Sequence, residues 1–172
     1  MATTRSLYLV RHAIAAERGP KWPDDALRPL TQAGAARMRL VAAGLARLGV
    51  EPGVVLTSPL VRAKQTAEIL SRAFIPPPKI VVLPLLAPGG APSKVAEALG
   101  TYRSRENVAL VGHEPDLGEL GAWLTGARLP IVFKKGGTCR IDVEEWPPAR
   151  RGQLVFHATP RMLRALGKKR QA

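Results

Sequence analysis

Leu7-Tyr8-Leu9-Val10-Arg11-His12-Ala13 is an apolar run that ends abruptly in two ionisable side chains. Its first four residues have β character, which predicts a buried strand over residues 7–10. Arg11 and His12 then stand at the carboxyl end of that strand. In open α/β sheets, ligands bind beyond the carboxyl ends of the strands. The segment therefore predicts both a strand of the core and a ligand site at its end.

The same arrangement recurs twice further along the chain. The strand predicted over residues 54–56 runs into Thr57-Ser58 ahead of Arg62, and the strand predicted over 108–111 runs into His113-Glu114. A third apolar run predicts a strand over residues 80–83. Helices are predicted from N-cap Thr31 to Gly49, from Pro59 to Phe74, over residues 93–103, onward from Pro115, and over residues 160–166.

Strands that alternate with helices predict a three-layer αβα sandwich around a mostly parallel sheet. The last third of the chain differs, because residues 139–143 and 153–157 predict two antiparallel strands joined by a Pro/Arg loop. The length of 172 residues suits one domain with a sizeable core. We expect a single catalytic domain over residues 1–166 and a basic tail over residues 167–172.

The composition is that of an ordinary globular protein, with 46% apolar and 23% charged residues. No apolar run reaches the ~18 residues that a membrane helix needs. The apolar run Leu7–Val10 is too short for a secretory signal, so we expect a cytoplasmic protein. The single cysteine, Cys139, excludes an internal disulfide and predicts a small apolar residue in a strand. We expect a monomer because no long exposed apolar helix face is evident.

The charge balance is strongly basic, with 26 Lys and Arg against 13 Asp and Glu and a formal charge of +13. Such a protein attracts nucleic acid, acidic membrane surfaces or phosphorylated proteins. The basic residues are spread along the chain, without the interleaved aromatic residues that a single-strand binder uses. Nucleic-acid binding is therefore not expected to be the main function.

The side chains at the strand ends suit a phosphoryl group. Arginine presents a planar fork of donors that matches phosphate oxygens, and histidine can be a neutral nucleophile or a cationic donor. Arg11, Arg62 and a protonated His113 could neutralise the phosphoryl oxygens without a metal, while His12 attacks. Taken singly, each residue has an ordinary structural interpretation. Their shared position at strand ends favours a common site.

Three segments also resemble the signature blocks of a known family, in the same order. They are Leu9–Ala13, Thr57–Glu68 and Val111–Pro115, and together they look like the histidine phosphatase superfamily of phosphoglycerate-mutase-like enzymes. The resemblance implies that His12 attacks phosphorus and becomes phosphohistidine. It also implies that Arg11, Arg62 and His113 bind the phosphoryl oxygens, and that no metal or organic cofactor takes part.

Within the superfamily the chain looks most like the short SixA-type phosphohistidine phosphatases. The loop over residues 84–92 is short and holds no carboxylate, and Leu85 stands where many relatives have a glutamate that protonates an alkoxide leaving group. Protonated imidazole leaves readily without such an acid. The resemblance therefore implies a phosphohistidine substrate, on a phosphorylated protein such as a phosphohistidine-containing phosphotransfer protein.

Several roles stay open at this stage. Glu114 is interpreted first as an orienter of His113 or a helix-start charge, although Glu114 or Asp116 could also serve as a proton donor. Arg28 and Lys21 are interpreted as surface charges. A general small-molecule phosphomonoesterase of the same superfamily remains an alternative function, as does a basic phosphate-binding or nucleic-acid-binding protein without turnover.

Overall fold

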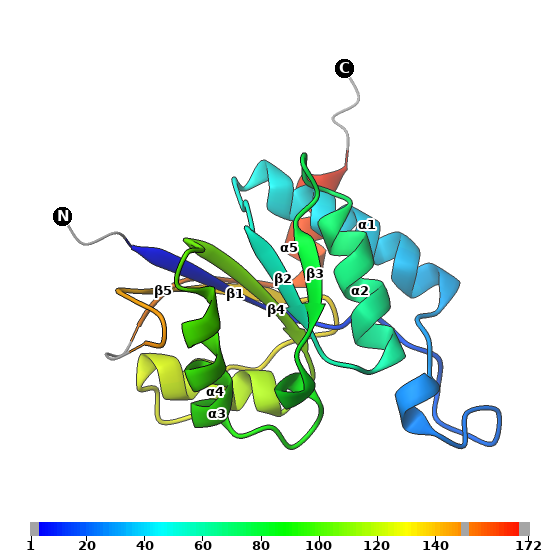
Figure 1. The fold of residues 1–172 in the computed structure, drawn as a ribbon. Helices are drawn as coiled ribbons and strands as arrows, with labels where there is room; N and C mark the ends of the chain where they lie inside the picture. The colour runs from blue at the N-terminus through cyan, green and yellow to red at the C-terminus, as the bar shows by residue number, and fades with distance from the viewer. Residues whose placement is uncertain (1–3, 149–151, 169–172) are drawn as a thin grey trace.

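The computed structural model describes residues 4–148 and 152–168, which include a six-stranded sheet with helices on both faces (Figure 1). The strand order is β3-β2-β4-β1-β5-β6. Pairing is parallel from β3 through β2 and β4 to β1, and antiparallel from β1 to β5 and from β5 to β6. The strands are β1 (Arg5–Arg11), β2 (Val54–Thr57), β3 (Lys79–Val82), β4 (Asn107–Gly112), β5 (Thr138–Val143) and β6 (Gln153–Ala158). The predicted parallel sheet with an antiparallel C-terminal pair is confirmed.

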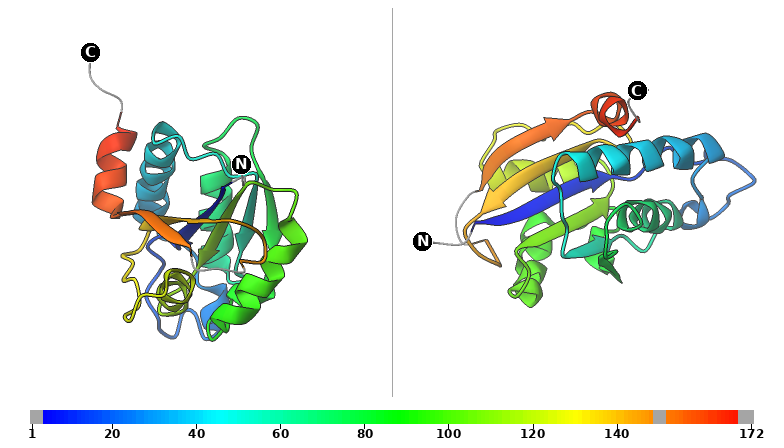
Figure 2. Two further views of the ribbon diagram at one scale, coloured as in Figure 1. Left: turned by 90° about the vertical axis from the view of Figure 1, so that its left-hand side faces the viewer. Right: turned by 90° about the horizontal axis from the view of Figure 1, so that it is seen from above.

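Alternating side chains of β1 point into two separate cores, one on each face of the sheet. Leu7 and Leu9 pack in the core beneath α3 and α4, whereas Tyr8 and Val10 pack in the core beneath α1, α2 and α5. Figure 2 shows the sheet between these two helical layers. The helices are α1 (Gln32–Arg47), α2 (Val61–Ser71), α3 (Pro92–Ala98), α4 (Asp116–Thr125) and α5 (Pro160–Gly167). The predicted three-layer sandwich is confirmed.

Helices α1 and α5 approach each other closely through glycine. A Cβ added at Gly44 of α1 would lie 2.1 Å from the Leu163 carbonyl oxygen, and one added at Gly167 of α5 would lie 1.9 Å from that of Leu40. Gly167 is therefore the packed last residue of a helix, although the sequence suggested that the basic tail starts there. Lys168 is the C-cap residue of α5, and residues 169–172 of the predicted tail lie outside the described residues.

Two of the predicted helices differ from those in the structure. Helix α2 begins at Val61 and ends at Ser71, so Pro59 precedes it and Phe74 follows it. Leu60, rather than Ser58, is the N-cap residue of this helix, and the Ser58 hydroxyl takes part in the site described below. The helix predicted over residues 93–103 is split into α3 and a 3₁₀ turn over Leu99–Tyr102. Gly100 within that turn is a weak α-helix former, which favours the tighter turn.

The buried thiol of Cys139 lies in β5, as predicted. Burial raises the pKa of this thiol to about 12, so it stays protonated and packs as a small apolar group. Among residues 4–148 and 152–168, no helix is long and apolar enough to cross a membrane.

Candidate active site

The four side chains singled out in the sequence converge because their strands are neighbours in the sheet. In the paired register, Arg11 at the end of β1 lies opposite Gly112 at the end of β4. His12 and His113 come directly after these two residues, and their ring centroids are 5.0 Å apart. Arg62 lies in the first turn of α2, which follows the adjacent strand β2. His12, Arg62 and His113 are all buried.

His12 is held as a neutral imidazole with a defined proton position. Its Nδ1 lies 2.7 Å from the carbonyl oxygen of Ala13, which can only accept, so Nδ1 carries the proton. Burial lowers the pKa of His12 to about 3, and the positive charges of Arg62 and Arg11 act in the same direction. The lone pair on Nε2 is therefore available to attack an electrophile at neutral pH.

His113 is fixed by a serine that the sequence analysis left without a role. Its Nε2 lies 2.8 Å from Ser58 Oγ, which also accepts a hydrogen bond from the Leu60 amide. The Ser58 hydroxyl can then donate to Nε2, which leaves the proton of neutral His113 on Nδ1. Burial lowers the pKa of His113 to about 4. His113 is therefore neutral in the ligand-free site, because burial and the nearby arginines oppose a further positive charge. Its protonation when a phosphoryl group is bound stays a prediction.

Arg62 is positioned by Asp25, which lies in a 3₁₀ turn over Asp25–Leu27. Its Nη1 donates to the Asp25 carbonyl oxygen at 2.7 Å, and its Nη2 donates to the Asp25 carboxylate at 2.9 Å. Arg28 binds the same carboxylate at 3.0 Å and donates to the Ala16 carbonyl at 2.7 Å. Arg28 is only 8% exposed, so the expectation of a surface charge was wrong. A buried guanidinium needs such partners, and Asp25 provides one.

Arg11 is anchored to the segment between α4 and β5. Its Nη1 donates to the Phe133 carbonyl oxygen, and the Phe133 amide donates to Glu114 Oε1 at 2.7 Å. Burial raises the pKa of Glu114, although the Phe133 hydrogen bond and the charge of Arg11 oppose this shift. The hydrogen bond of His113 goes to Ser58, so Glu114 is not its orienter. Glu114 instead ties Phe133 to the start of α4.

Three donors at this site have no partner in the described part of the chain. They are Arg11 Nε, Arg62 Nε and His113 Nδ1, and they are among only five such buried side-chain atoms in residues 4–148 and 152–168. Buried polar groups are normally hydrogen-bonded, so a cluster of unpartnered donors needs an explanation. A tetrahedral oxyanion offers several acceptor oxygens of the kind that these donors lack.

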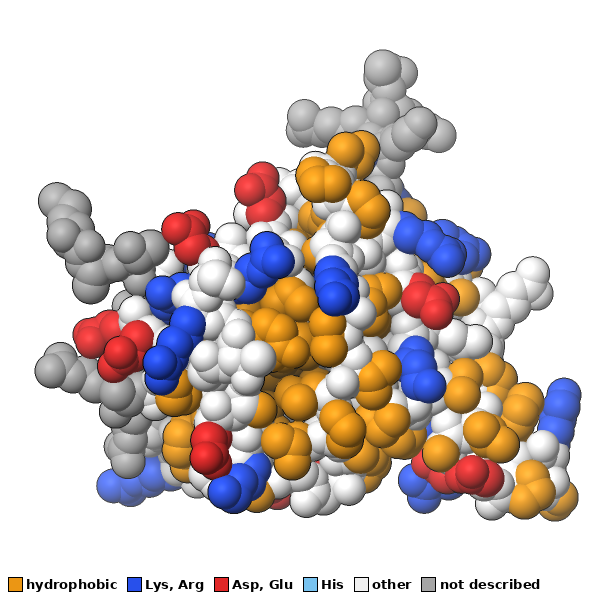
Figure 3. Space-filling model, viewed as in Figure 1, with side chains coloured by type: hydrophobic (Ala, Val, Ile, Leu, Met, Phe, Trp, Pro, Cys, Tyr) orange, Lys and Arg blue, Asp and Glu red, His pale blue; other side chains and the backbone are white. Residues whose placement is uncertain are grey.

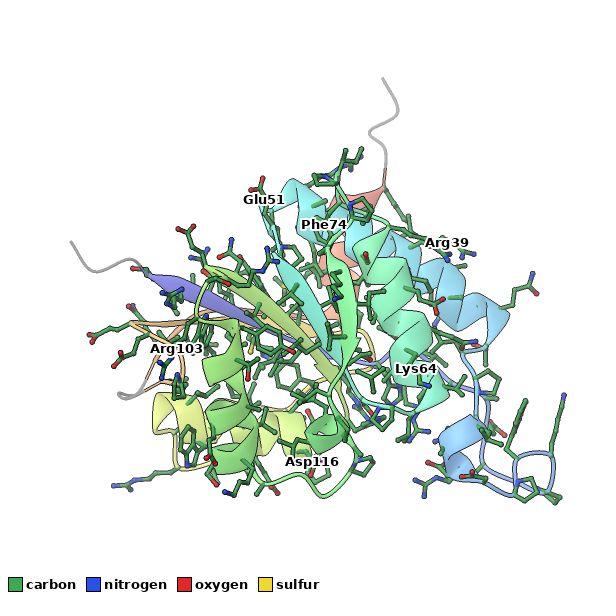
Figure 4. The ribbon with its side chains drawn as sticks, in the orientation of Figure 1. Arg39, Glu51, Lys64, Phe74, Arg103 and Asp116 are labelled. Atoms are coloured by element: carbon green, nitrogen blue, oxygen red, sulfur yellow. The ribbon has the colours of Figure 1, made fainter. Side chains whose placement is uncertain are left out.

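Asp116, which the sequence left open as a proton donor, accepts a hydrogen bond from the backbone. Its Oδ2 accepts a hydrogen bond from the Gly89 amide at 3.0 Å, which ties the start of α4 to the loop after β3 (Figure 4). In residues 4–148 and 152–168, no group of three or more His, Cys, Asp or Glu side chains is arranged to hold a metal ion.

Comparisons with known proteins agree with this geometry. A family model described as histidine phosphatase superfamily (branch 1) matches residues 7–86. Phosphohistidine phosphatase SixA of Escherichia coli K12 is 32% identical over 141 residues, which cover 81% of this chain and 86% of SixA. The chain belongs to the histidine phosphatase superfamily and is of the SixA type.

Two further relatives align with most of the chain. An uncharacterized protein of Picosynechococcus sp. is 45% identical over 148 residues, which cover 79% of this chain and 88% of that protein. A solved structure of the protein histidine phosphatase SixA, complexed with tungstate, superposes with a TM-score of 0.82 at 29% identity. The superposition covers 92% of this chain and 99% of the SixA chain. Membership of the superfamily indicates phosphatase activity.

Two residues that hold His113 and Arg62 in place were not predicted from the sequence. Ser58 was noted as a polar residue at a strand end, but its contact with His113 depends on how β2 and β4 lie together. Asp25 sits 37 residues before Arg62 in an irregular loop, where no periodic pattern indicates a partner. The only signal was chemical, because a buried arginine requires an acceptor.

The lowered pKa values of the two buried histidines predict how the three histidines of the chain titrate. We expect the ring protons of His12 and His113 to show no titration between pH 6 and 8, because both pKa values lie at about 4 or below. The exposed His157 should titrate at a higher pH than these two, although partial burial lowers its pKa too. Heteronuclear NMR of the histidine ring C–H groups measures this directly. Titration of His12 near pH 6.5 would contradict the buried neutral imidazole.

Replacing Asp25 with asparagine should weaken substrate binding without abolishing activity. The amide keeps one acceptor for Arg62 but removes the charge that balances Arg62 and Arg28. We expect about a 10-fold fall in kcat/KM, mostly through a higher KM. A charge-assisted hydrogen bond is worth ~1.5–3 kcal/mol, and asparagine retains part of that interaction. Asp24→Asn, at the exposed neighbour, is the matched control. An unchanged KM in Asp25→Asn would exclude this positioning role.

Proposed function

We propose that the protein is a phosphohistidine phosphatase that carries the phosphoryl group on His12 during turnover. The observation that supports this most directly is the set of three unpartnered donors beside the neutral His12. A phosphoryl group of phosphohistidine offers three oxygens to those donors and a phosphorus atom to the nucleophile. The SixA structure that resembles this chain is complexed with tungstate, which is a tetrahedral oxyanion like phosphate.

The proposed reaction has two steps. In the first, the lone pair of His12 Nε2 forms a bond to phosphorus while the P–N bond to the substrate histidine breaks, and that imidazole leaves with a proton from solvent. Arg11 and Arg62 neutralise the negative charge on the phosphoryl oxygens, and His113 donates from Nδ1. In the second step, a water oxygen forms a bond to phosphorus while the bond between phosphorus and His12 Nε2 breaks. Inorganic phosphate leaves, and the proton lost by the water passes to the phosphate or to solvent. His12 returns to its neutral form, with Nδ1–H still bonded to Ala13 O.

The carboxylates near the site favour a substrate that needs little help with its leaving group. Asp25 binds Arg62 and Arg28, and the charge of those arginines lowers the pKa of its carboxyl despite an opposing desolvation effect. Glu114 binds the Phe133 amide, and Asp116 binds the Gly89 amide. Each is thus committed to a structural contact. A serine or sugar alkoxide would need a proton donor here, whereas protonated imidazole would not.

The proposed substrate is a phosphorylated protein, with a phosphohistidine-containing phosphotransfer protein as the expected kind. The formal charge of +13 would speed encounter with an acidic partner. Lys and Arg side chains are scattered over the face shown in Figure 3, with Asp and Glu between them, rather than gathered into one stripe. This distribution suits a general field better than a nucleic-acid groove.

The test compares two peptides of the same sequence, one carrying phosphohistidine and the other phosphoserine at the central position. Wild-type protein is incubated with each in the presence of EDTA, and released phosphate is measured at several enzyme concentrations. We expect kcat/KM for the phosphohistidine peptide to exceed that for the phosphoserine peptide by about 10²-fold or more, because only the phosphoserine reaction needs the missing acid. Equal release from both peptides would favour a general phosphomonoesterase.

A further inference from the structure

A small basic hollow lies beside the His12 segment, on the side of the sheet that α1 and α5 cover. Arg37 and Lys135 are exposed around it and Arg164 is half-buried, whereas Met38 and Val41 are buried and form its apolar floor. The basic hollow, defined by these five residues together with the backbone described next, therefore combines an apolar base with a positive rim.

The hollow is adjacent to the nucleophile. Ala13 lines it, and the carbonyl oxygen of Ala13 accepts the hydrogen bond from His12 Nδ1. Gly136 also lines it, and its amide donates to the carbonyl oxygens of Arg11 and His12 at 3.1 and 3.2 Å. A group bound in the hollow would thus sit against the two backbone segments that hold His12.

In the described part of the chain, the cations around the hollow form no ion pair with an acidic side chain. Of the ion pairs formed within residues 4–148 and 152–168, none includes Arg37, Lys135 or Arg164. Arg164 donates to the Pro160 carbonyl oxygen at 3.2 Å, which holds its side chain along α5. Three positive charges around one hollow repel one another, and an anion placed among them removes that repulsion.

The size of the hollow limits what can enter. Its volume is about 60 Å³, and one water needs at least ~10–15 Å³ of such space. A carboxyl group on a short aliphatic stem fits this volume, because the methylenes can contact Met38 and Val41 while the oxygens face the cations.

We infer that the basic hollow is a subsite for an acidic side chain, glutamate in particular, next to the phosphohistidine of the protein substrate. This inference rests on the proposed function, because it places the glutamate and the phosphoryl group on one partner. A carboxylate tethered to the phosphorylated segment binds at a high effective concentration. The subsite therefore selects among phosphohistidine proteins by the residues that flank the modified histidine.

The test uses two phosphohistidine peptides that differ only in having glutamates or glutamines on both sides of the phosphohistidine. We expect wild-type protein to show a KM about 10-fold lower for the glutamate peptide, because several partly exposed charge pairs each make a small contribution. The variant R37Q/K135Q/R164Q should lose this preference. It should hydrolyse phosphoramidate, which carries no flanking side chain, at the wild-type rate.

The matched control removes the same number of charges elsewhere. Arg39, Lys64 and Lys79 are exposed, and Figure 4 labels the first two on α1 and α2. R39Q/K64Q/K79Q should keep the glutamate preference at 0.15 M salt. If the two triple variants lose the preference equally, the general positive field explains it and the subsite is excluded.

A binding measurement separates this inference from the proposed function. Fluorescence polarisation with His12→Ala and the two phosphohistidine peptides needs no turnover. Tighter binding of the glutamate peptide, lost when R37Q/K135Q/R164Q is added to His12→Ala, would support the subsite even if wild-type protein hydrolysed neither peptide. Equal binding of both peptides would overturn the subsite while leaving phosphohistidine hydrolysis intact.

Discussion

Replacing His12 with alanine is expected to lower kcat/KM for a phosphohistidine peptide by about 10⁴-fold or more. Removal of a nucleophile leaves only the binding and electrostatic contributions of the remaining groups, and losses of this size are usual for such a residue. The variant should also fail to retain phosphate on the protein. Rapid mixing of wild-type protein with labelled peptide, followed by an alkaline quench that preserves phosphohistidine, should trap label that His12→Ala lacks.

The control for this experiment is His157→Ala, which removes the remaining histidine outside the site. His157 is exposed on the edge strand β6, where its ring packs edge-on against the ring of Phe133. We expect His157→Ala to keep most of the wild-type activity, because Phe133 binds Arg11 and Glu114 through its backbone. Thermal unfolding of both variants checks that each is folded. If folded His12→Ala still released phosphate at the wild-type rate, the covalent step proposed for His12 would be excluded.

Replacing Arg62 with lysine should lower kcat/KM by about 10²- to 10³-fold, which is the loss typical for one preorganised donor to a developing oxyanion. Lysine keeps the positive charge but has one side-chain nitrogen. It therefore cannot replace both Nη atoms at Asp25 and also offer the Nε donor to the phosphoryl group. In the structure, both Nη atoms of Arg62 bind Asp25, and Nε has no partner in the described part of the chain. Steady-state kinetics should show the loss mostly in kcat.

The matched control is Arg72→Lys, just beyond the end of α2. The Arg72 side chain is 77% exposed and lies 4.0 Å from Glu68, so its loss should change kcat/KM less than twofold. Guanidine in solution offers a further readout, because partial rescue of an Arg62→Ala variant would show that the planar fork itself is needed. A full rate in Arg62→Lys would mean that charge alone suffices.

Much of the fold follows from local patterns. The four apolar residues before Arg11 have the β character of a buried strand, and the structure buries Leu7 through Val10 in β1. Thr31 is a strong N-cap residue, and its hydroxyl accepts from the Gly34 amide at 2.9 Å. Such features depend on residues a few positions apart. The alternation of strands and helices then leaves few arrangements of layers to consider.

Local patterns were less informative where a side chain serves two neighbours. Ser58 before Pro59 is typical of a helix start, but its hydroxyl contacts His113 and the helix begins later, at Val61. Arginine is usually a surface residue, yet Arg28 is buried against Asp25. In each case the partner comes from another element, so no sequence window contains both groups.

The sequence by itself determined that His12, Arg11, Arg62 and His113 stand at strand and helix ends of one α/β pattern, and it indicated their chemistry. Strand order decided that they meet, because β1 lies beside β4 and β4 beside β2. Burial decided their protonation, since the removal of water lowers the pKa of His12 and His113 and makes both neutral. Asp25, Ser58 and Glu114 hold the site through contacts that only the folded chain creates. The residue types therefore specify the reaction, whereas tertiary packing sets its geometry and charge.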